Sequence, residues 1–389
     1  MFNLYDASDL NNNFIIIKYY KKMTKKNLII FMPSVEGGGV EKNFFLVSNY
    51  LSKYINNIFI ITSDRSIKNK LNKKIKLLTP QSKFWVNKGR LMKYFICLIY
   101  LLKFFLNHKN NLVFSFQANA YAIILCKVFN TKIISRSNSS SIGWSKNIFK
   151  NLLYRLILGL SNQVIVNSHD FKKELDKKFS IKSEVILNPL NKKQVIINSK
   201  KKINLDFYKT KELKIINVGR LVDQKDHMTL LYAANLLKNT MNFKLLIIGR
   251  GQNKKKISEF IKENNLNKMV KIIPFQKNPL KFMRMSDLFI LTSKFEGLPN
   301  VLLEAQCLKK YIISTNCPTG PREILLNGKA GDLVKVSDFK SISKKIIEFK
   351  KNKKSNKQKI NLGNKKINRF EYNVNMQKYL FLVYKFMKF

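Results

Sequence analysis

The feature that most constrains the fold of this chain is an apolar run that ends in glycines and leads into a helical pattern. Residues 27–33 (NLIIFMP) have the composition of a buried strand, the loop at 34–41 holds three consecutive glycines, and residues 42–53 carry apolar side chains at helical spacing. Strand, glycine loop and helix in this order open a doubly wound α/β domain. We therefore expect a parallel sheet in the N-terminal half.

Further apolar runs of strand length follow, with helical patterns between several of them. In the first half they cover residues 58–62, 112–116, 132–135 and 163–166, and residues 184–189 close that half. In the second half, strands are predicted at 213–218, 244–248, 271–274, 288–292 and 311–314, and helices at 228–238, 255–263 and 300–307. Strands that alternate with helices indicate parallel sheets. The predicted fold class is α/β, with two Rossmann-like, doubly wound domains facing a cleft.

The length of the chain supports this division, because 389 residues exceed what one hydrophobic core usually holds. The stretch that joins the two halves is rich in Lys and Asn and has no sustained periodicity. The predicted parts are an N-terminal tail (1–26), an N-terminal domain (27–189), a linker region (190–212), a C-terminal domain (213–366) and a C-terminal helix that packs back toward the N-terminal domain (367–389).

The net charge favours an anionic partner. Lys and Arg number 73 against 23 Asp and Glu, a formal charge of +50, which would attract phosphates, nucleic acid or anionic lipid. Abundant Lys, Asn, Ile and Phe also fit an AT-rich genome, so mutational bias and selection both stay open. The basic residues are spread along the chain, whereas a nucleic-acid arm would concentrate them. No nucleic-acid recognition motif is present, and we expect no nucleic-acid partner.

Cysteine usage fits a reduced, cytoplasmic setting. Cys97, Cys126, Cys307 and Cys317 form no CxxC pair and no Cys/His cluster of zinc spacing. No signal peptide is visible over residues 1–26.

The most specific motif is FEGLPNVLLEA, which follows the strand LFILTS. Glu296 lies in the loop that leaves this strand, and Glu304 lies on the next helix, whose first turn suits Pro299. The amides from Gly297 to Asn300 would present free N–H groups and a partial positive charge to a diphosphate. Glu304 would then accept hydrogen bonds from ribose hydroxyls and Glu296 from sugar hydroxyls. A solvated loop residue and an ordinary helix-face residue remain the alternative.

Two further segments have glycines at strand ends. Gly219 ends a strand, and Arg220 and Lys225 follow in the loop, where a guanidinium fork and an ammonium group suit a diphosphate leaving group. A chance cation pair in this Lys-rich chain is the alternative. The loop EGGGVE at 36–41 lets another molecule approach its backbone, but it lacks the P-loop ending and does not match the dinucleotide fingerprint. A plain turn also stays open.

Together these segments resemble glycosyltransferase family 4 of the GT-B superfamily, also called glycosyl transferases group 1. The resemblance runs from about Asn27 to Lys345 and includes SVEGGGVEKNFFLVSNYL, VFSFQANAYA, VILNPL, INVGRLVDQKDHMTLL, LLIIGRGQ and the FEGLPNVLLEA motif. It implies a GT-B fold in which the N-terminal domain binds the acceptor and the C-terminal domain binds the nucleotide sugar. It further implies a metal-independent transfer that retains the anomeric configuration, with no metal site and no cofactor.

The resemblance also implies roles for individual residues. The expected catalytic residues are Glu296, Arg220 and Lys225. The expected donor-binding residues are Glu304, Gly219, Gly249, Gly251, Gly297, Leu298, Asn300 and Val301. Gly38, Gly39, Gln117, Asn119 and Arg136 are candidates for contacts with acceptor or phosphate, because several follow strand ends; a structural role is equally open for the last three. We nominate no general base.

The segment STNCPTGPREIL at 314–325 resembles enzymes that add hexose or N-acetylhexosamine to lipid-linked glycans. We therefore expect a nucleotide diphosphate sugar as donor, with UDP as its expected nucleotide, and a lipid-linked saccharide acceptor in bacterial envelope polysaccharide or glycoprotein glycan synthesis. A basic nucleic-acid-binding protein, a UDP-sugar epimerase of the same fold and an inactive nucleotide-sugar binder are the alternatives.

Two apolar segments suggest contact with a membrane surface. Residues 91–106 and 146–160 combine a broad apolar face with Lys or Arg, as interfacial helices do. The first is short for a bilayer span and holds two internal charges. Helices that simply cover the sheet are the alternative. We expect a peripheral protein at the inner face of the cytoplasmic membrane, with an anionic lipid surface as a partner.

Overall fold

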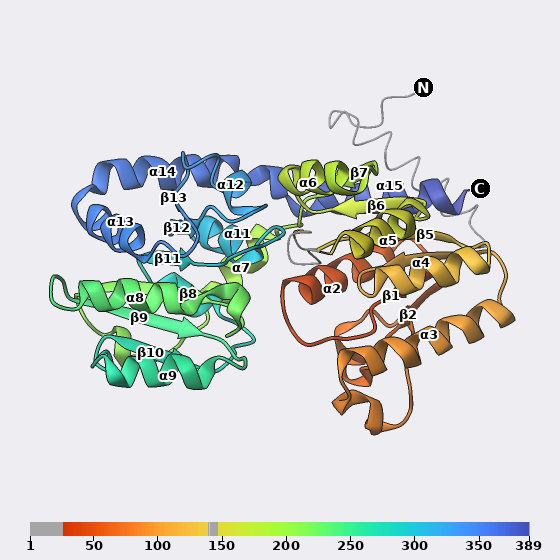
Figure 1. Ribbon diagram of the computed structural model, residues 1–389, viewed down its shortest axis with the longest axis horizontal. Helices are drawn as coiled ribbons and strands as arrows, with labels where there is room; N and C mark the ends of the chain where they lie inside the picture. Colours follow the sequence, from red (N-terminus) through yellow and green to blue (C-terminus); the bar gives the residue numbers. More distant parts are fainter. Residues whose placement is uncertain (1–25, 139, 141–146, 389) are drawn as a thin grey trace.

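The computed structural model describes residues 26–138, 140 and 147–388, and forms two α/β domains (Figure 1). The predicted N-terminal tail lies outside the described residues, apart from Lys26. Each domain is built on one parallel sheet covered by helices, as the alternating pattern predicted.

The N-terminal domain contains a seven-stranded sheet in the order β3-β2-β1-β4-β5-β6-β7, in which every neighbouring pair is parallel. Its strands are β1 (Asn27–Phe31), β2 (Ile58–Ile61), β3 (Lys76–Leu78), β4 (Asn111–Ser115), β5 (Lys132–Arg136), β6 (Gln163–Val166) and β7 (Ser183–Val185). Its helices are α2 (Gly39–Leu51), η1 (Arg65–Lys70), η2 (Lys83–Asn87), α3 (Arg90–Asn107), α4 (Asn119–Val128), α5 (Ile148–Gly159) and α6 (His169–Phe179).

The C-terminal domain contains a six-stranded parallel sheet in the order β10-β9-β8-β11-β12-β13. Its strands are β8 (Leu213–Val218), β9 (Phe243–Ile248), β10 (Val270–Ile273), β11 (Leu288–Leu291), β12 (Tyr311–Thr315) and β13 (Asp332–Val334). Its helices are η5 (Asp223–Lys225), α8 (His227–Leu237), α9 (Lys254–Glu263), α10 (Leu280–Met285), α11 (Asn300–Cys307), α12 (Pro321–Ile324), α13 (Phe339–Lys351) and α14 (Lys353–Lys366).

The central strands are buried on both faces, which explains their nearly continuous apolar sequences. In β1, Leu28 and Ile30 join one hydrophobic core, and Ile29 and Phe31 join the other. The C-terminal sheet divides two cores in the same way. Because neighbouring strands run in the same direction, their carboxyl ends meet at one edge of each sheet, where ligands collect in open α/β folds.

The segment 190–212, which the sequence predicted as a linker region, includes helices that the sequence did not predict. It contains helix α7 (Lys192–Ser199) and the short helix η4 (Asp206–Tyr208). Val195 and Tyr208 are buried in a core of the C-terminal domain. The helical pattern was missed because α7 is short and mostly polar, so its few apolar residues form no long stripe.

The C-terminal helix α15 (Tyr372–Met387) crosses to the N-terminal domain after the short helix η6 (Ile367–Phe370) (Figure 1). Tyr379, Leu380 and Val383 are part of the same core as β1 and β4. The chain therefore passes between the domains twice, and its last helix completes the first domain.

The two apolar segments of the sequence become helices α3 and α5 on the outside of the N-terminal domain (Figure 1). Residue 146, where the second predicted segment starts, lies outside the described residues. Within the described part of the chain, no helix combines the length and apolar character that a membrane crossing requires.

Candidate active site

Helix α11 and the loop before it bring together both glutamates of the predicted motif. Glu296 and Glu304 are buried, each with 6% of its surface exposed. Glu296 precedes the helix, and Glu304 lies on its second turn. A carboxylate this deeply buried needs hydrogen-bonding partners. Those partners define the site.

The partners of Glu296 come from the C-terminal domain itself. Its carboxylate forms an ion pair with the Lys225 ammonium group and accepts a hydrogen bond from Ser293 Oγ at 2.6 Å. Lys225 reaches it because its side chain runs along Gly219, where a Cβ atom would lie 3.6 Å from the lysine Cδ. The structure thus brings together Gly219, Lys225 and Glu296, which the sequence had linked only by motif.

Arg220 lies at the exposed edge of the same loop. Its guanidinium donates to Gln224 Oε1 at 3.2 Å, and Gln224 Nε2 donates to the carbonyl of Phe295 at 2.8 Å. These hydrogen bonds connect the loop after Gly219, which holds Arg220 and Gln224, to Phe295, the residue before Glu296. Arg220 is therefore near the paired glutamate while its guanidinium remains open to solvent.

The N-terminal domain supplies the partner of Glu304. Lys42, on the first turn of α2, forms an ion pair with its carboxylate. Nearby, Asn300 Nδ2 donates to the carbonyl of Gly39 at 3.2 Å. Asn188 joins the same boundary by donating to the carbonyl of Leu298 at 2.9 Å and to Asn300 Oδ1 at 2.8 Å. Helix α11 of the C-terminal domain is therefore in direct contact with the start of α2 and the glycine loop of the N-terminal domain.

Two helix N-termini meet at this contact. Helix α2 starts after Gly38 and α11 starts after Pro299, and neither N-terminus is capped by a side chain. Each has backbone N–H groups without helical partners and a partial positive charge. Because their first residues, Gly39 and Asn300, are in contact, the two N-termini are suited to hold an anion such as a diphosphate.

The glycine loop is also held by two arginines. Arg90 forms a bidentate pair with the Glu36 carboxylate, and this hydrogen bonding lowers the pKa of Glu36 from its usual value to about 2. Arg250, from the C-terminal domain, donates to the carbonyl of Glu36 at 2.5 Å and lies over the ring of Phe275. Cations from both domains therefore surround the loop.

Three of the predicted donor-binding glycines have a packing reason of their own. A Cβ at Gly249 would lie 1.9 Å from the carbonyl oxygen of Gly219, and one at Gly251 would lie 2.3 Å from that of Leu221. A Cβ at Gly297 would lie 2.2 Å from the carbonyl oxygen of Asn138. Any larger residue would push these backbones apart. Glycine is therefore required at these three positions by packing alone, whether or not a ligand binds.

The other predicted donor-binding residues have different exposure. Leu298 is buried, and its carbonyl is already bound by Asn188. Val301 is half-buried and packs against the core below α11. Of the acceptor loop, Gly38 and Gly39 are exposed.

The structure does not support an acceptor contact for Arg136. Its side chain is fully buried and donates to Tyr379, Asn138 and Asn188. Arg136 follows a strand end as predicted, but its side chain turns into the domain and holds helix α15.

Gln117 and Asn119 are also engaged in structural hydrogen bonds. Gln117 Oε1 accepts from the backbone N–H of Ser34 at 2.8 Å. Asn119 accepts from Ser115 Oγ at 2.8 Å and donates to the carbonyl of Arg136 at 3.0 Å. Both side chains hold the strand-end loops in position.

Glu323 from the segment 314–325 links the two domains. Its carboxylate accepts from the backbone N–H groups of His169 at 2.7 Å and Asp170 at 3.4 Å, at the start of α6. Burial raises the pKa of Glu323. It caps a helix of the opposite domain.

Lys42, Arg250 and Asn188 are among the boundary residues that the sequence did not single out. Lys42 and Glu304 are 262 positions apart, and Arg250 and Glu36 are 214 apart. In a chain with 73 basic residues, nothing local distinguishes two of them. Only the folded arrangement identifies them.

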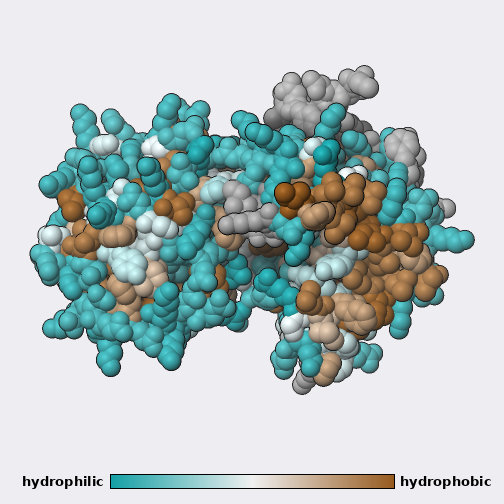
Figure 2. All heavy atoms as spheres, viewed as in Figure 1, coloured by the Kyte–Doolittle hydropathy of each residue, from teal (hydrophilic) through white to brown (hydrophobic). Residues whose placement is uncertain are grey.

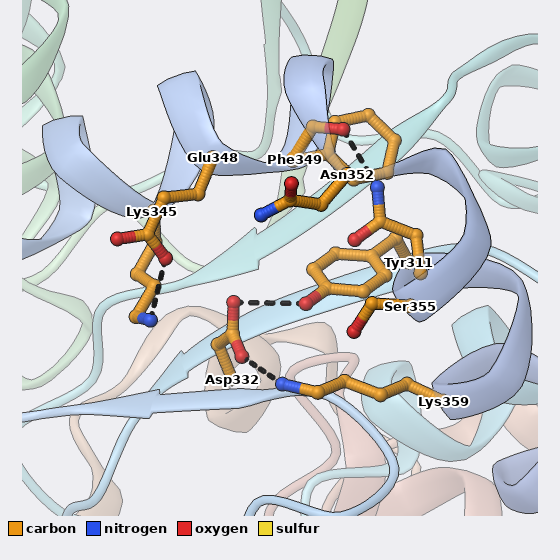
Figure 3. A pocket seen from close by; sticks show the side chains of 9 residues that line it. Tyr311, Asp332, Lys345, Glu348, Phe349, Asn352, Ser355 and Lys359 are labelled. Atoms are coloured by element: carbon orange, nitrogen blue, oxygen red, sulfur yellow. Dashed lines mark hydrogen bonds and ion pairs between the residues drawn. The ribbon is translucent and has the colours of Figure 1, made fainter.

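A polar cavity of about 200 Å³ lies away from this boundary (Figure 3). In it, Asp332 accepts from the Tyr311 hydroxyl at 2.9 Å and pairs with Lys359. The cavity contains none of the predicted site residues. In the described part of the chain, no group of His, Cys, Asp and Glu side chains is arranged to hold a metal ion.

Comparison with known proteins finds a family match in the C-terminal part, since residues 199–366 match the model of glycosyl transferases group 1. The match covers less than half of the chain. An uncharacterized glycosyltransferase of Methanocaldococcus jannaschii is 33% identical over 58% of this chain and 60% of its own length. An N-acetylgalactosaminyltransferase of Campylobacter jejuni, acting on N-acetylgalactosamine-N,N'-diacetylbacillosaminyl-diphospho-undecaprenol, is 29% identical over 61% of this chain and 67% of its own. The matches thus span about two thirds or less of these relatives.

Solved structures extend the likeness to both domains. HepE from Anabaena, in complex with UDP and glucose, aligns with a TM-score of 0.74 over 92% of this chain and 99% of its own, at 16% identity. This likeness shows the fold, which is the GT-B arrangement predicted from the sequence. The predicted resemblance to group 1 glycosyltransferases is confirmed. The roles of the individual site residues stay predictions.

Proposed function

We propose that this protein transfers a hexose or an N-acetylhexosamine from a nucleotide diphosphate sugar to a lipid-linked glycan. The transfer retains the anomeric configuration and needs no metal ion, and UDP is the expected nucleotide. The observation that carries the proposal is the meeting of Glu296, Glu304 and Lys225 with two uncapped helix N-termini at the domain boundary.

Each group in this arrangement has a task in the proposed reaction. The helix N-termini bind the diphosphate, and Arg220 and Lys225 stabilise the negative charge that grows on it as the sugar departs. Glu304 accepts hydrogen bonds from the ribose hydroxyls after Lys42 moves away, and Glu296 accepts them from hydroxyls of the donor sugar. Because Ser293 and Lys225 fix the Glu296 carboxylate, its orientation is set before the sugar arrives.

The relatives support the choice of donor and acceptor. The Anabaena structure binds UDP and glucose, and the Campylobacter relative acts on a saccharide linked to diphospho-undecaprenol. Relatives from Erwinia and Staphylococcus are glycosyltransferases of amylovoran and capsular polysaccharide biosynthesis. We infer a role in bacterial envelope polysaccharide or glycoprotein glycan synthesis, at the inner face of the cytoplasmic membrane.

The test is a transfer assay with the purified full chain in EDTA. UDP-, GDP- and ADP-sugars are combined with lipid-linked acceptors extracted from membranes, and nucleotide release and glycolipid mass are followed. Glu304→Ala and Arg220→Ala are compared with Glu212→Ala and Arg284→Ala, two substitutions of the same types away from the domain boundary. We expect a mass increase of one hexose or N-acetylhexosamine that only the first two variants lose, and product NMR showing the donor's anomeric configuration.

Other results would overturn the proposal in recognisable ways. Conversion of the UDP-sugar to its epimer without an acceptor would identify an epimerase. Nucleotide-sugar binding without any product would identify an inactive binder. No transfer from any donor, together with tight and salt-sensitive binding to nucleic acid, would make the +50 charge the functional feature.

A further inference from the structure

The outer surface of the N-terminal domain carries a broad apolar area (Figure 2). It is formed by neighbouring helices α3, α4 and α5, and we call it the α3–α5 face. Its exposed large apolar residues are Leu91, Met92, Phe95, Leu106, Tyr121, Ile124, Val128, Ile148, Phe149, Leu152, Leu153 and Leu156. Soluble domains rarely expose a contiguous apolar area of this kind unless another surface covers it.

The exposure is not a by-product of covering the sheet. Helix α5 already presents Ile157 and Leu158 to the core, where they are 7% and 4% exposed. On its other side, Ile148 and Phe149 are 81% and 82% exposed. The helix is therefore apolar on a face that contributes nothing to the packing of the domain, which indicates a second apolar environment.

The charges on these helices are all of one sign. Helices α3, α4 and α5 hold no Asp or Glu, while Lys103, Lys127, Lys150 and Arg155 are exposed among the apolar residues. The adjacent helix α6 has the mixed composition HDFKKELDKKF, which is usual for a solvated face. A surface with apolar side chains and only positive charges is complementary to an anionic bilayer, because the apolar side chains enter the interface and the cations attract the lipid head groups.

The face also begins at the edge that carries the candidate active site. Arg90, the first residue of α3, binds Glu36 of the glycine loop, and Leu91 follows it directly. Gln117, two positions before α4, binds Ser34 of the same loop. The apolar face thus starts next to the glycine loop. If a bilayer covers this face, the head group of a lipid-linked acceptor lies near the domain boundary while its lipid tail stays in the bilayer.

We propose that the α3–α5 face docks the protein on an anionic lipid bilayer and orients the domain boundary toward the membrane. This deepens the proposed function, on which it rests, by assigning the surface through which a membrane-anchored acceptor reaches the site. A second copy of the chain is the less favoured occupant, because it would bring identical cations against those of the first.

The experiment is flotation of the full chain with vesicles of phosphatidylglycerol and phosphatidylcholine, compared with phosphatidylcholine alone. We expect binding to the anionic vesicles that raised salt weakens, and a loss of about tenfold or more in Phe149→Ser/Leu152→Ser. The matched control is Ile196→Ser/Ile197→Ser on α7, where both side chains are also exposed. Unchanged thermal unfolding of both variants would show that the fold is intact.

Trp85 gives an independent reading of orientation, because it lies in η2, which packs against α3. The Trp144→Phe variant leaves Trp85 as the fluorescent tryptophan. With brominated lipids we expect its fluorescence to be quenched on vesicle binding. Vesicle binding without quenching, or equal binding by the α5 variant and the control, would assign another surface and overturn the inference.

The absence of vesicle binding would also overturn the inference. If analytical ultracentrifugation shows a dimer that the Phe149→Ser/Leu152→Ser variant does not form, the face is a self-association interface. Because flotation needs neither donor nor acceptor, its failure is separable from failure of the transfer assay. A protein that transfers sugar to a detergent-solubilised acceptor but does not float would keep the proposed function and lose this inference.

Discussion

The two domains cover the same kind of parallel sheet with helices, but their outer surfaces differ. In the N-terminal domain, α3 to α5 expose Leu, Ile, Phe and a few cations, whereas α9, α13 and α14 of the C-terminal domain expose mainly Lys (Figure 2). The inner faces are alike because both must pack on a sheet. The outer faces are free of that requirement, so their difference reflects what each domain meets in solution.

The domains also differ in what they bring to their common boundary. The C-terminal domain supplies both buried glutamates and the cations Arg220 and Lys225. The N-terminal domain supplies backbone at Gly39 and one ammonium group at Lys42. This division predicts that the chemistry of the proposed transfer depends on C-terminal side chains, while N-terminal side chains adjust affinity.

The largest effect is expected from removing the cation that holds Glu296. Lys225→Met should lower kcat by about 10²–10³-fold, because in the proposed reaction the ammonium group stabilises charge on the leaving diphosphate, and in the structure it pairs with the Glu296 carboxylate. Lys244→Met, which breaks a surface pair with Glu212 in the same domain, is the control. Steady-state rates of nucleotide release measure both, and equal losses would remove the special role of Lys225.

The two sides of α5 should respond very differently to truncation. Leu158→Ala should lower the free energy of unfolding by about 2–5 kcal/mol, because it leaves a cavity under the helix. Leu153→Ala, at a residue that is 55% exposed, should change it by less than about 0.5 kcal/mol. Urea denaturation measures both. A large cost at Leu153 would mean that the exposed face contributes to the fold, which would weaken the comparison between the domains.

The parts of the fold that the sequence predicted are those with strong local patterns. Helix α11 begins and ends at the predicted residues, and the strands buried on both faces were found as apolar runs. The strands β3, β7 and β13 were not predicted as separate elements; each has three residues and lies at a sheet edge. An edge strand has one pairing partner and less burial, so its sequence carries a weaker apolar signal.

The candidate site shows the same limit. Glu296, Glu304 and Lys225 were predicted because they lie in motifs beside strand ends. Arg136 also lies at a strand end, but its position in the sequence does not show whether its side chain points to solvent or into the domain. In the structure the side chain is buried inside the domain. The Lys42 contact could not be predicted, because it depends on how two separately folded domains meet.

Buried basic side chains offer a third contrast between the domains. Arg136 in the N-terminal domain has three side-chain partners, whereas both ring nitrogens of His227 in the C-terminal domain lack a hydrogen-bond partner among the described residues. Burial lowers the pKa of His227 from its ordinary value of 6.5 to about 4. The folded chain therefore holds this imidazole neutral at pH values where the unfolded chain protonates it.

This difference predicts acid lability in the C-terminal domain. The stability contribution is fully present above pH 6.5 and is lost as the pH falls toward about 4, by up to about 3 kcal/mol. His227→Leu should remove that slope from the unfolding free energy between these pH values. Urea denaturation at a series of pH values measures it. An unchanged slope would show that other groups cause the acid response.

The smallest effect is expected at Lys42, the N-terminal side chain that reaches into the other domain's site. Its ammonium group pairs with Glu304, so ribose hydroxyls must displace it before they bind the carboxylate. The lysine is 42% exposed, and pairs of this exposure contribute less than about 1 kcal/mol. Lys42→Met should therefore bind UDP about two- to fivefold more tightly.

Calorimetric titration with UDP measures this change, and Lys53→Met, also on the N-terminal side near the end of α2, serves as the control. Tighter binding without loss of kcat would support the division between a catalytic C-terminal set and an adjusting N-terminal one. Weaker binding would mean that Lys42 contacts the nucleotide directly once displaced. In that case the N-terminal domain contributes to donor recognition, and the functional contrast between the domains is confined to their outer helices.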